Sequence, residues 1–233
     1  LNAYGGGNFT KLMAVILLAQ FVGTIIFGAL IGVTSKKFPI MVGFPIRIAA
    51  TAAMLLFSHE GANFVIILAL SFVIGMGMAG SSVTIYAILA DMADVDELIT
   101  SINRPGTCSG MATFVRKIAT GLSSAVIGVL LAAVGYSEVL ANAGERQSAA
   151  TQTGITYIYV FAPIVLMVAT LIFTKLFPMN QKEFEVITKE IARRKGEDDS
   201  VATAEEIAIC EKVTGFSYDR LWNRENAMKM RNR

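Results

Sequence analysis

Five long apolar stretches constrain the fold of this chain more than any other feature. They cover residues 12–34, 39–57, 64–89, 111–134 and 156–177. Each is close to the roughly 20 residues that a helix needs to cross the hydrocarbon of a bilayer. Inside lipid every backbone polar group must be paired within the structure, so uninterrupted apolar runs of this length predict transmembrane helices. We therefore expect an all-α protein embedded in the lipid bilayer, with five spans in residues 1–177.

The composition of the chain excludes most other classes of protein. Hydrophobic residues make up 54% of the chain and charged residues 16%, against about 25% charged in soluble domains. The formal net charge is only +2, and no basic run is interleaved with aromatic residues, so nucleic acid is not an expected partner. The single histidine, His59, lies in a loop, and no cluster has metal-ligand spacing. We expect neither an enzyme nor a metal site.

The loops between the apolar stretches alternate in charge, and this predicts the orientation in the membrane. Lys36 and Lys37 follow the first stretch and Arg104 follows the third, whereas the loop with His59 and Glu60 carries no Lys or Arg. By the positive-inside rule the basic loops and the carboxyl terminus face the cytoplasm. We expect a multi-pass plasma-membrane protein whose amino terminus lies outside, an arrangement that suits the end of a longer bundle.

The tail, residues 178–233, has the composition of a soluble segment. Its first part, 181–195, places its apolar residues on one helical stripe. They are Phe184, Ile187 and Ile191. Thr203 and Glu206 have the spacing of a capping box and predict a second helix that ends near Gly215. We expect helices along the cytoplasmic face, and a docking site for a regulatory protein is the alternative.

Gly75, Gly77 and Gly80 match the pattern G-x-G-x-x-G, which holds a dinucleotide when it joins a strand to a helix. Here the pattern lies in the middle of the third apolar stretch, with no strand before it. Small residues at such spacing let membrane helices approach closely. We therefore interpret the glycines as helix-packing positions.

Lys117 lies inside the fourth apolar stretch, about 10 Å along the helix from Gly110. An ionisable group in a span is costly unless a partner or a wet cavity compensates for its desolvation. Polar and small residues recur around it at three- and four-residue spacing. They are Thr113, Lys117, Thr120, Gly121, Ser124 and Gly128. This polar stripe predicts a wet path or a close helix contact, and the alternative is a lysine that snorkels to the interface above a packing seam.

Arg47 is a second charge within a span, about two turns into the second stretch. Asp91 and Asp94 follow the third stretch with i, i+3 spacing, so their carboxylates share one helical face. We expect Arg47 to pair with Asp91 or Asp94. The alternative is that all three reach interfacial water separately.

Several uncharged side chains are candidate ligands for a polyol, in addition to Lys117. They are Gln20, Thr24, Ser82, Tyr86, Thr113 and Ser124. Hydroxyls in membrane helices commonly bond their own backbone instead, so none of them is strong evidence alone.

The segment from Ala90 to Lys117 carries a family resemblance. It reads A-D-M-A-D-V-D-E-L, then R-P-G after five residues, then a lysine after ten more. This run resembles the signature of the glycoside-pentoside-hexuronide:cation symporters, the melibiose-carrier family of the major facilitator superfamily. The resemblance extends to F-P-M-N-Q-K at the start of the tail and implies helices eight to twelve of a twelve-helix fold. Asn103 stands at the position of the family's arginine, with Arg104 one step later, and Pro105 replaces its glutamate.

The resemblance implies part of a secondary transporter that moves a sugar or glycoside with Na+ or H+ and needs no other cofactor. In such relatives the lysine matching Lys117 lies near the cation and sugar sites. The acids matching Asp91 and Asp94 join a cytoplasmic charge network, in which we include Arg47 and Arg104. The family's cation-site acids lie on amino-terminal helices that this chain lacks, so those helices are expected partners. A membrane-anchored regulatory protein that acts through its tail, and a lipid carrier on the same fold, remain alternatives.

Overall fold

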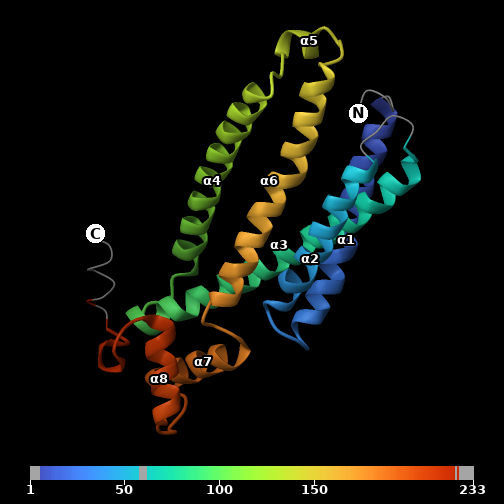
Figure 1. Ribbon diagram of the computed structural model, residues 1–233. Coiled ribbons are helices and arrows are strands. Elements are labelled where there is room, and N and C mark those ends of the chain that lie inside the picture. The colour runs from blue at the N-terminus through green and yellow to red at the C-terminus, as the bar shows by residue number, and fades with distance from the viewer. Residues whose placement is uncertain (1–5, 58–61, 224, 226–233) are drawn as a thin grey trace.

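The computed structural model describes residues 6–57, 62–223 and 225, and this part of the chain is helical and without strands (Figure 1). Five helices are long and apolar enough to cross a membrane. They are α1 (Gly6–Ile31), α2 (Phe38–Ala53), α3 (Phe64–Thr100), α4 (Pro105–Ala133) and α6 (Ala149–Leu176). The expected all-α, five-span architecture is therefore confirmed. His59 and Glu60 lie outside the described residues.

Shorter helices complete the described structure. They are η2 (Met54–Phe57), α5 (Glu138–Asn142), α7 (Gln181–Lys195), α8 (Ala204–Thr214) and η3 (Tyr218–Arg220). The short α5 joins α4 to α6, and η2 extends α2. Pro45 and Pro163 lie inside α2 and α6, and both helices continue through them.

Helices α1, α2 and α3 form a bundle because small residues let their backbones approach. A Cβ on Gly75 would lie 2.6 Å from the carbonyl oxygen of Ile16 in α1, and a Cβ on Gly77 would lie 2.7 Å from that of Gly43 in α2. Any side chain at these positions would push the helices apart. The packing interpretation of the G-x-G-x-x-G pattern is confirmed.

Helix α3 is longer than the apolar pattern indicates. We expected a loop over 90–110, but the helix continues to Thr100 and α4 begins at Pro105. No glycine or proline interrupts residues 81–100, so the backbone has no reason to leave the helix there. The helix ends where Ser101 adopts a left-handed conformation, with φ 56°, and its N–H donates to the carbonyl oxygen of Glu97. The acidic segment is thus the last part of a continuous helix.

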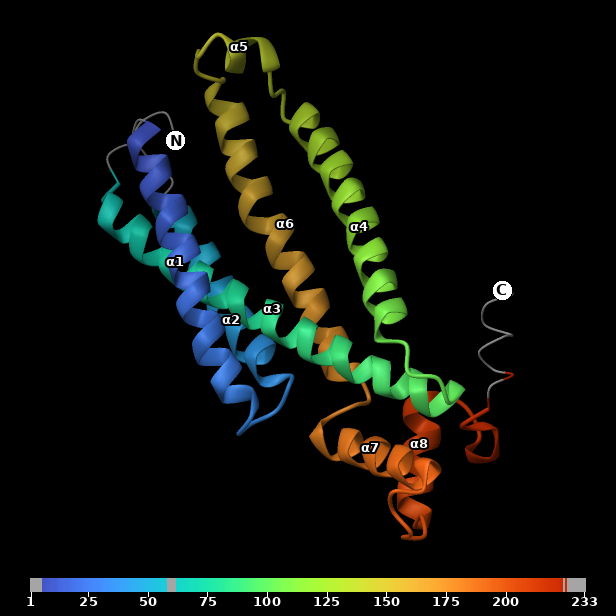
Figure 2. The same cartoon turned by 180° about the vertical axis from the view of Figure 1, so that it is seen from behind.

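Helices α4 and α6 are joined by α5, and α4 stands away from the α1–α3 bundle over most of its length (Figures 1 and 2). Helix α6 packs against α2 through a small cluster of buried side chains. It consists of Ile40, Phe44 and Met167. None of the residues of α4, all of which are described, is buried. The polar stripe predicted on α4 is therefore open along the length of the helix.

The tail helices pack against the end of α3. Buried apolar residues from α3, the segment before α7, both tail helices and the segment after η3 form one core. They are Val95, Leu98, Met179, Ile187, Ile191, Cys210 and Leu221. The N–H of Trp222 donates to the carbonyl oxygen of Leu98 at 2.8 Å, and that of Asn223 donates to Ile99 at 3.3 Å. These bonds occupy carbonyls that a helix end otherwise leaves unpaired. The last turns of α3 thus belong to the folded tail.

The two helices predicted for the tail are confirmed. The helix expected over 181–195 is α7, and its stripe residues Ile187 and Ile191 are buried. Thr203 and Glu206 form the predicted capping box at the start of α8, which ends at Gly215 with φ 72°.

Candidate functional site

A cluster of charged side chains surrounds the end of α3. Asp91, with only 5% of its side chain exposed, pairs with Lys36 of the loop between α1 and α2 at 2.5 Å. The expected partner, Arg47, is too far away: it contacts Gly77, which lies about 21 Å before Asp91 along the helix. The Nε of Arg47 is buried and finds no hydrogen-bond acceptor within the described structure. Lys36 therefore takes the role predicted for Arg47 toward Asp91.

The neighbouring acids of α3 have their own partners. Arg104 binds Asp96 through two hydrogen bonds, Nε to Oδ2 at 2.6 Å and Nη2 to Oδ1 at 2.9 Å. These bonds raise the pKa of Arg104 above its ordinary value. Glu97 accepts from Asn103 Nδ2 at 2.7 Å and pairs with Lys195 of the tail at 2.8 Å. Arg104 belongs to a charge network as predicted, but its partner is Asp96, and Glu97, Lys36 and Lys195, which complete the cluster, were not predicted for it.

The α1–α2 loop also contacts the start of the tail. The ammonium of Lys36 lies 3.7 Å from the centre of the Phe184 ring on α7. Lys37 Nζ donates to the carbonyl oxygen of Phe177 at 2.6 Å. Burial lowers the pKa of Lys37, against an opposing effect of Glu183. The loop is thereby attached to α3 on one side and to the tail on the other.

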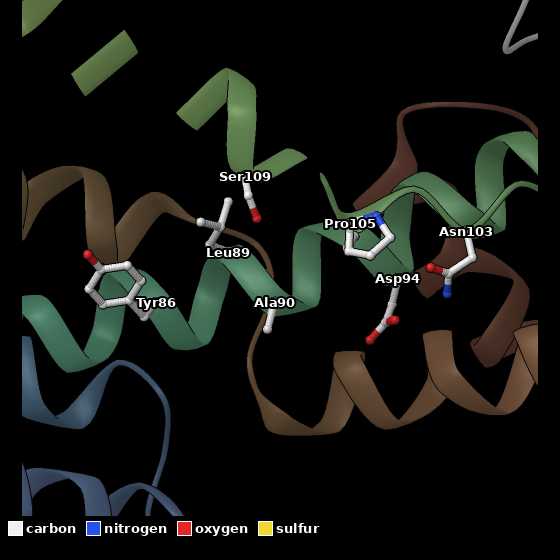
Figure 3. Close-up of a pocket in the computed structure, with 8 residues that line it drawn as sticks. Tyr86, Leu89, Ala90, Asp94, Asn103, Pro105 and Ser109 are labelled. Atoms are coloured by element: carbon white, nitrogen blue, oxygen red, sulfur yellow. The ribbon is translucent and has the colours of Figure 1, made fainter. Parts of the chain in front are cut away.

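Asp94, one turn of α3 from both Asp91 and Glu97, lines an open pocket of about 450 Å³ between the end of α3 and the start of α4 (Figure 3). The residues that line it are Tyr86, Leu89, Ala90, Ala93, Asp94, Asn103, Pro105 and Ser109. One carboxylate, one amide and two hydroxyls in this wall are able to bind a polar or cationic group. Because the pocket is open, a neighbouring surface is needed to complete it.

The second part of the candidate site is the polar stripe of α4. The side chain of Lys117 is exposed, and no described carboxylate lies within ion-pair distance of it. The preceding residue, Arg116, donates through Nη1 to the hydroxyl of Tyr86 at 3.4 Å and so reaches from α4 to α3. Arg116 is not among the residues predicted for the site. Its position next to Lys117 in the sequence is the feature that could have indicated a role in the site.

The predicted sugar ligands do not gather into one site within the described structure. The hydroxyl of Thr24 donates to the carbonyl oxygen of Gln20 at 2.8 Å, and that of Ser82 donates to Met78 at 3.4 Å. Ser124 likewise bonds its own helix. Helix α1 packs on α2 and α3, whereas α4 contacts α3 and α6. Thr113 and Ser124 therefore lie apart from Gln20 and Thr24, and sugar binding by these residues stays a prediction.

Comparison with known proteins assigns the chain to a family. The family described as MFS/sugar transport protein matches residues 5–181. A putative sulfoquinovose importer of Escherichia coli (strain K12) is 32% identical over 124 residues, which are 53% of this chain and 25% of the importer. The uncharacterized symporter YjmB of Bacillus subtilis (strain 168) is 26% identical over 196 residues, which are 82% of this chain and 41% of the symporter.

The chain therefore spans less than half the length of these relatives. The family match nevertheless includes all five long helices and most of the chain. With its membrane-spanning helices, this chain belongs to the MFS/sugar transport protein family, a family of transporters rather than enzymes.

Proposed function

We propose that this chain is part of a secondary active transporter that carries a sugar together with Na+ or H+ by alternating access. The observation that carries the proposal is α4, a span with no buried residue that bears Lys117 on an exposed polar stripe. An ammonium surrounded by lipid is unfavourable. Its helix therefore requires a second bundle and a wet path, as transporters with two rocking bundles provide.

The proposed partners are the amino-terminal helices of the same transporter. The relatives are more than twice as long as their matched segments, so they have room for another bundle. That bundle would cover the polar stripe and complete the pocket around Asp94. We place the transporter in the plasma membrane, with the charge cluster and tail on the cytoplasmic side. Lys36, Lys37 and Arg104 lie at that end, in agreement with the positive-inside rule.

In this mechanism Lys117 is a mobile positive charge. Without the coupling cation, its ammonium pairs with carboxylates of the partner bundle. Cation binding to those carboxylates displaces the ammonium and opens the site for sugar. The cation and the sugar must then raise each other's affinity by the same factor. A sugar substrate is supported by the family and by the names of the relatives, one a putative sulfoquinovose importer and one an uncharacterized symporter.

The test is uptake of labelled sugar by the full-length transporter in proteoliposomes with an imposed cation gradient. Lys117→Ala should abolish accumulation against the gradient, because the site loses the charge that responds to the cation. Lys175→Ala, at an exposed lysine in the last turn of α6, should leave accumulation intact. Undiminished cation-driven accumulation by Lys117→Ala would contradict the mechanism.

The two alternatives have less support. A regulatory protein that acts through its tail needs a free docking face, but the apolar stripe of α7 is buried against α3. A lipid carrier needs a cavity lined by aromatic side chains, and the pocket around Asp94 has only Tyr86.

A further inference from the structure

The side chain of Lys36 has two partners that come from different parts of the chain. Its Nζ lies 2.5 Å from Oδ1 of Asp91 on α3 and 3.7 Å from the ring centre of Phe184 on α7. The side chain of Lys36 is 22% exposed and that of Asp91 is 5% exposed. The contact therefore joins the α1–α2 loop, the end of α3 and the tail in a setting that is largely shielded from water.

The ring contributes more than apolar surface at this position. The face of an aromatic ring carries negative electrostatic potential and attracts an ammonium, most strongly where water is excluded. A flexible lysine loses side-chain entropy when it pairs with a carboxylate. The ring of Phe184 favours the one arrangement of Lys36 that also reaches Asp91. It thus stabilises the ion pair without contacting the carboxylate itself.

Phe184 is held in place by the fold of the tail. The next turns of α7 insert Ile187 and Ile191 into the core shared with α3. At the other end of the helix, Lys195 pairs with Glu97 at 2.8 Å. A second tether, from Lys37 Nζ to the carbonyl oxygen of Phe177 at 2.6 Å, fixes the loop to the entry of the tail.

We propose that Phe184 is a positioning residue for transport: by holding Lys36 on Asp91, it makes the α1–α2 loop, the end of α3 and the tail move as one body. The inference rests on the proposed function, in which whole bundles rock against each other. A loop free to leave α3 would absorb part of that motion. Phe184 lies at the end of the bundle and away from its centre, so it acts on the rate of the conformational change and not on sugar affinity.

The test separates the ring from the volume of the side chain in the full-length transporter. Uptake is measured for a panel of labelled hexoses, uronic acids and sulfoquinovose, and kinetics are measured for any sugar that the wild type accumulates. Phe184→Leu keeps an apolar side chain but removes the ring, and should lower the maximal rate about 3- to 10-fold. The half-saturating sugar concentration should stay within about twofold, because the sugar site is untouched. Phe184→Trp keeps an aromatic face and should retain the wild-type rate.

A second comparison tests whether Phe184 acts through Lys36. In the background Lys36→Met/Asp91→Asn, where both charges are gone, Phe184→Leu should change the maximal rate no further. The matched control is Phe216→Leu, the same change at another partly buried phenylalanine of the tail core. It should leave both kinetic parameters unchanged. Phe184→Met provides a second variant without a ring if Phe184→Leu does not fold.

Three results would overturn the inference. The first is a wild-type maximal rate for Phe184→Leu. The second is equal impairment of Phe184→Leu and Phe184→Trp. The third is a further fall in the maximal rate when Phe184→Leu is added to Lys36→Met/Asp91→Asn. The second and third results would both indicate that Phe184 acts through packing and not through Lys36. A wild type that accumulates none of the sugars contradicts the proposed function, and the inference falls with it.

Discussion

Glu190 shows how a single residue holds the tail together. Its side chain is only 1% exposed, and it accepts hydrogen bonds from the Tyr218 hydroxyl at 2.6 Å, Arg194 Nε at 2.8 Å and Arg193 Nη1 at 3.2 Å. Burial alone would raise the pKa of Glu190, but these three donors outweigh it, and the pKa lies below its ordinary value. The ionised carboxylate is therefore the form that the folded tail prefers.

Replacing Glu190 should loosen the tail. Glu190→Gln removes the charge that two guanidinium groups share, and losing one partner of a buried ion pair costs about 3 kcal/mol. Faster amide hydrogen exchange in α7 and α8 is the expected readout. Glu185→Gln, at an exposed position of α7, should leave exchange unchanged. Equal protection of α7 in wild type and Glu190→Gln would contradict this role.

The same residue predicts a pH dependence. A carboxylate whose pKa is lowered by folding stabilises the folded state above its unfolded pKa, about 4.3. That contribution is lost as the pH falls from there through the folded pKa. Protection of α7 and α8 should therefore decline in wild type below about pH 4. Glu190→Gln should show a smaller decline, measured by exchange at matched intrinsic rates. An identical decline in both proteins would assign the effect to other carboxylates.

At the scale of helices, much of the fold could be predicted because hydrophobic length is a strong local signal. The five spans, the stripe of α7 and the capping box of α8 all followed from residue spacing. The end of α3 did not, because Val95 and Leu98 lie on a continuation of the helix that packs into a core with tail residues between 179 and 221. The partner of Asp91 was not predicted for a related reason. Whether Arg47 or Lys36 reaches Asp91 depends on how each base is placed along α3 once the helices pack, and not on its charge alone.

Helix packing gives a prediction at this scale. Gly77→Ala would place a Cβ 2.6 Å from the Cβ of Arg47 and 2.7 Å from the carbonyl oxygen of Gly43. Separating α2 from α3 to relieve these contacts should destabilise the bundle by about 1–3 kcal/mol. Thermal unfolding of the purified chain in detergent measures this. Gly28→Ala on α1, where an added Cβ meets nothing within 4 Å, is the matched control. Equal melting temperatures for the two variants would show that the α2–α3 contact tolerates a methyl group.

For the whole molecule, the limit of sequence reasoning lies at α4. The stripe around Lys117 could be predicted from its spacing, but the groups that face it could not, since no residue of α4 is buried within the described structure. In the most apolar stretch of α3, 39% of the residues are buried within the described structure, whereas in that of α4 none is. A sugar site that depends on this exposed face needs the second bundle that we propose.

The purified chain reconstituted alone in liposomes should therefore accumulate no sugar above the level of protein-free liposomes. Without a facing bundle, the stripe of α4 meets lipid, and no wet path forms around Lys117. Expressing the proposed amino-terminal bundle as a separate polypeptide should restore cation-driven uptake, because helical bundles that fold separately are able to associate in the membrane. Accumulation by the chain alone would contradict the two-bundle mechanism and place the whole transport path within these five helices.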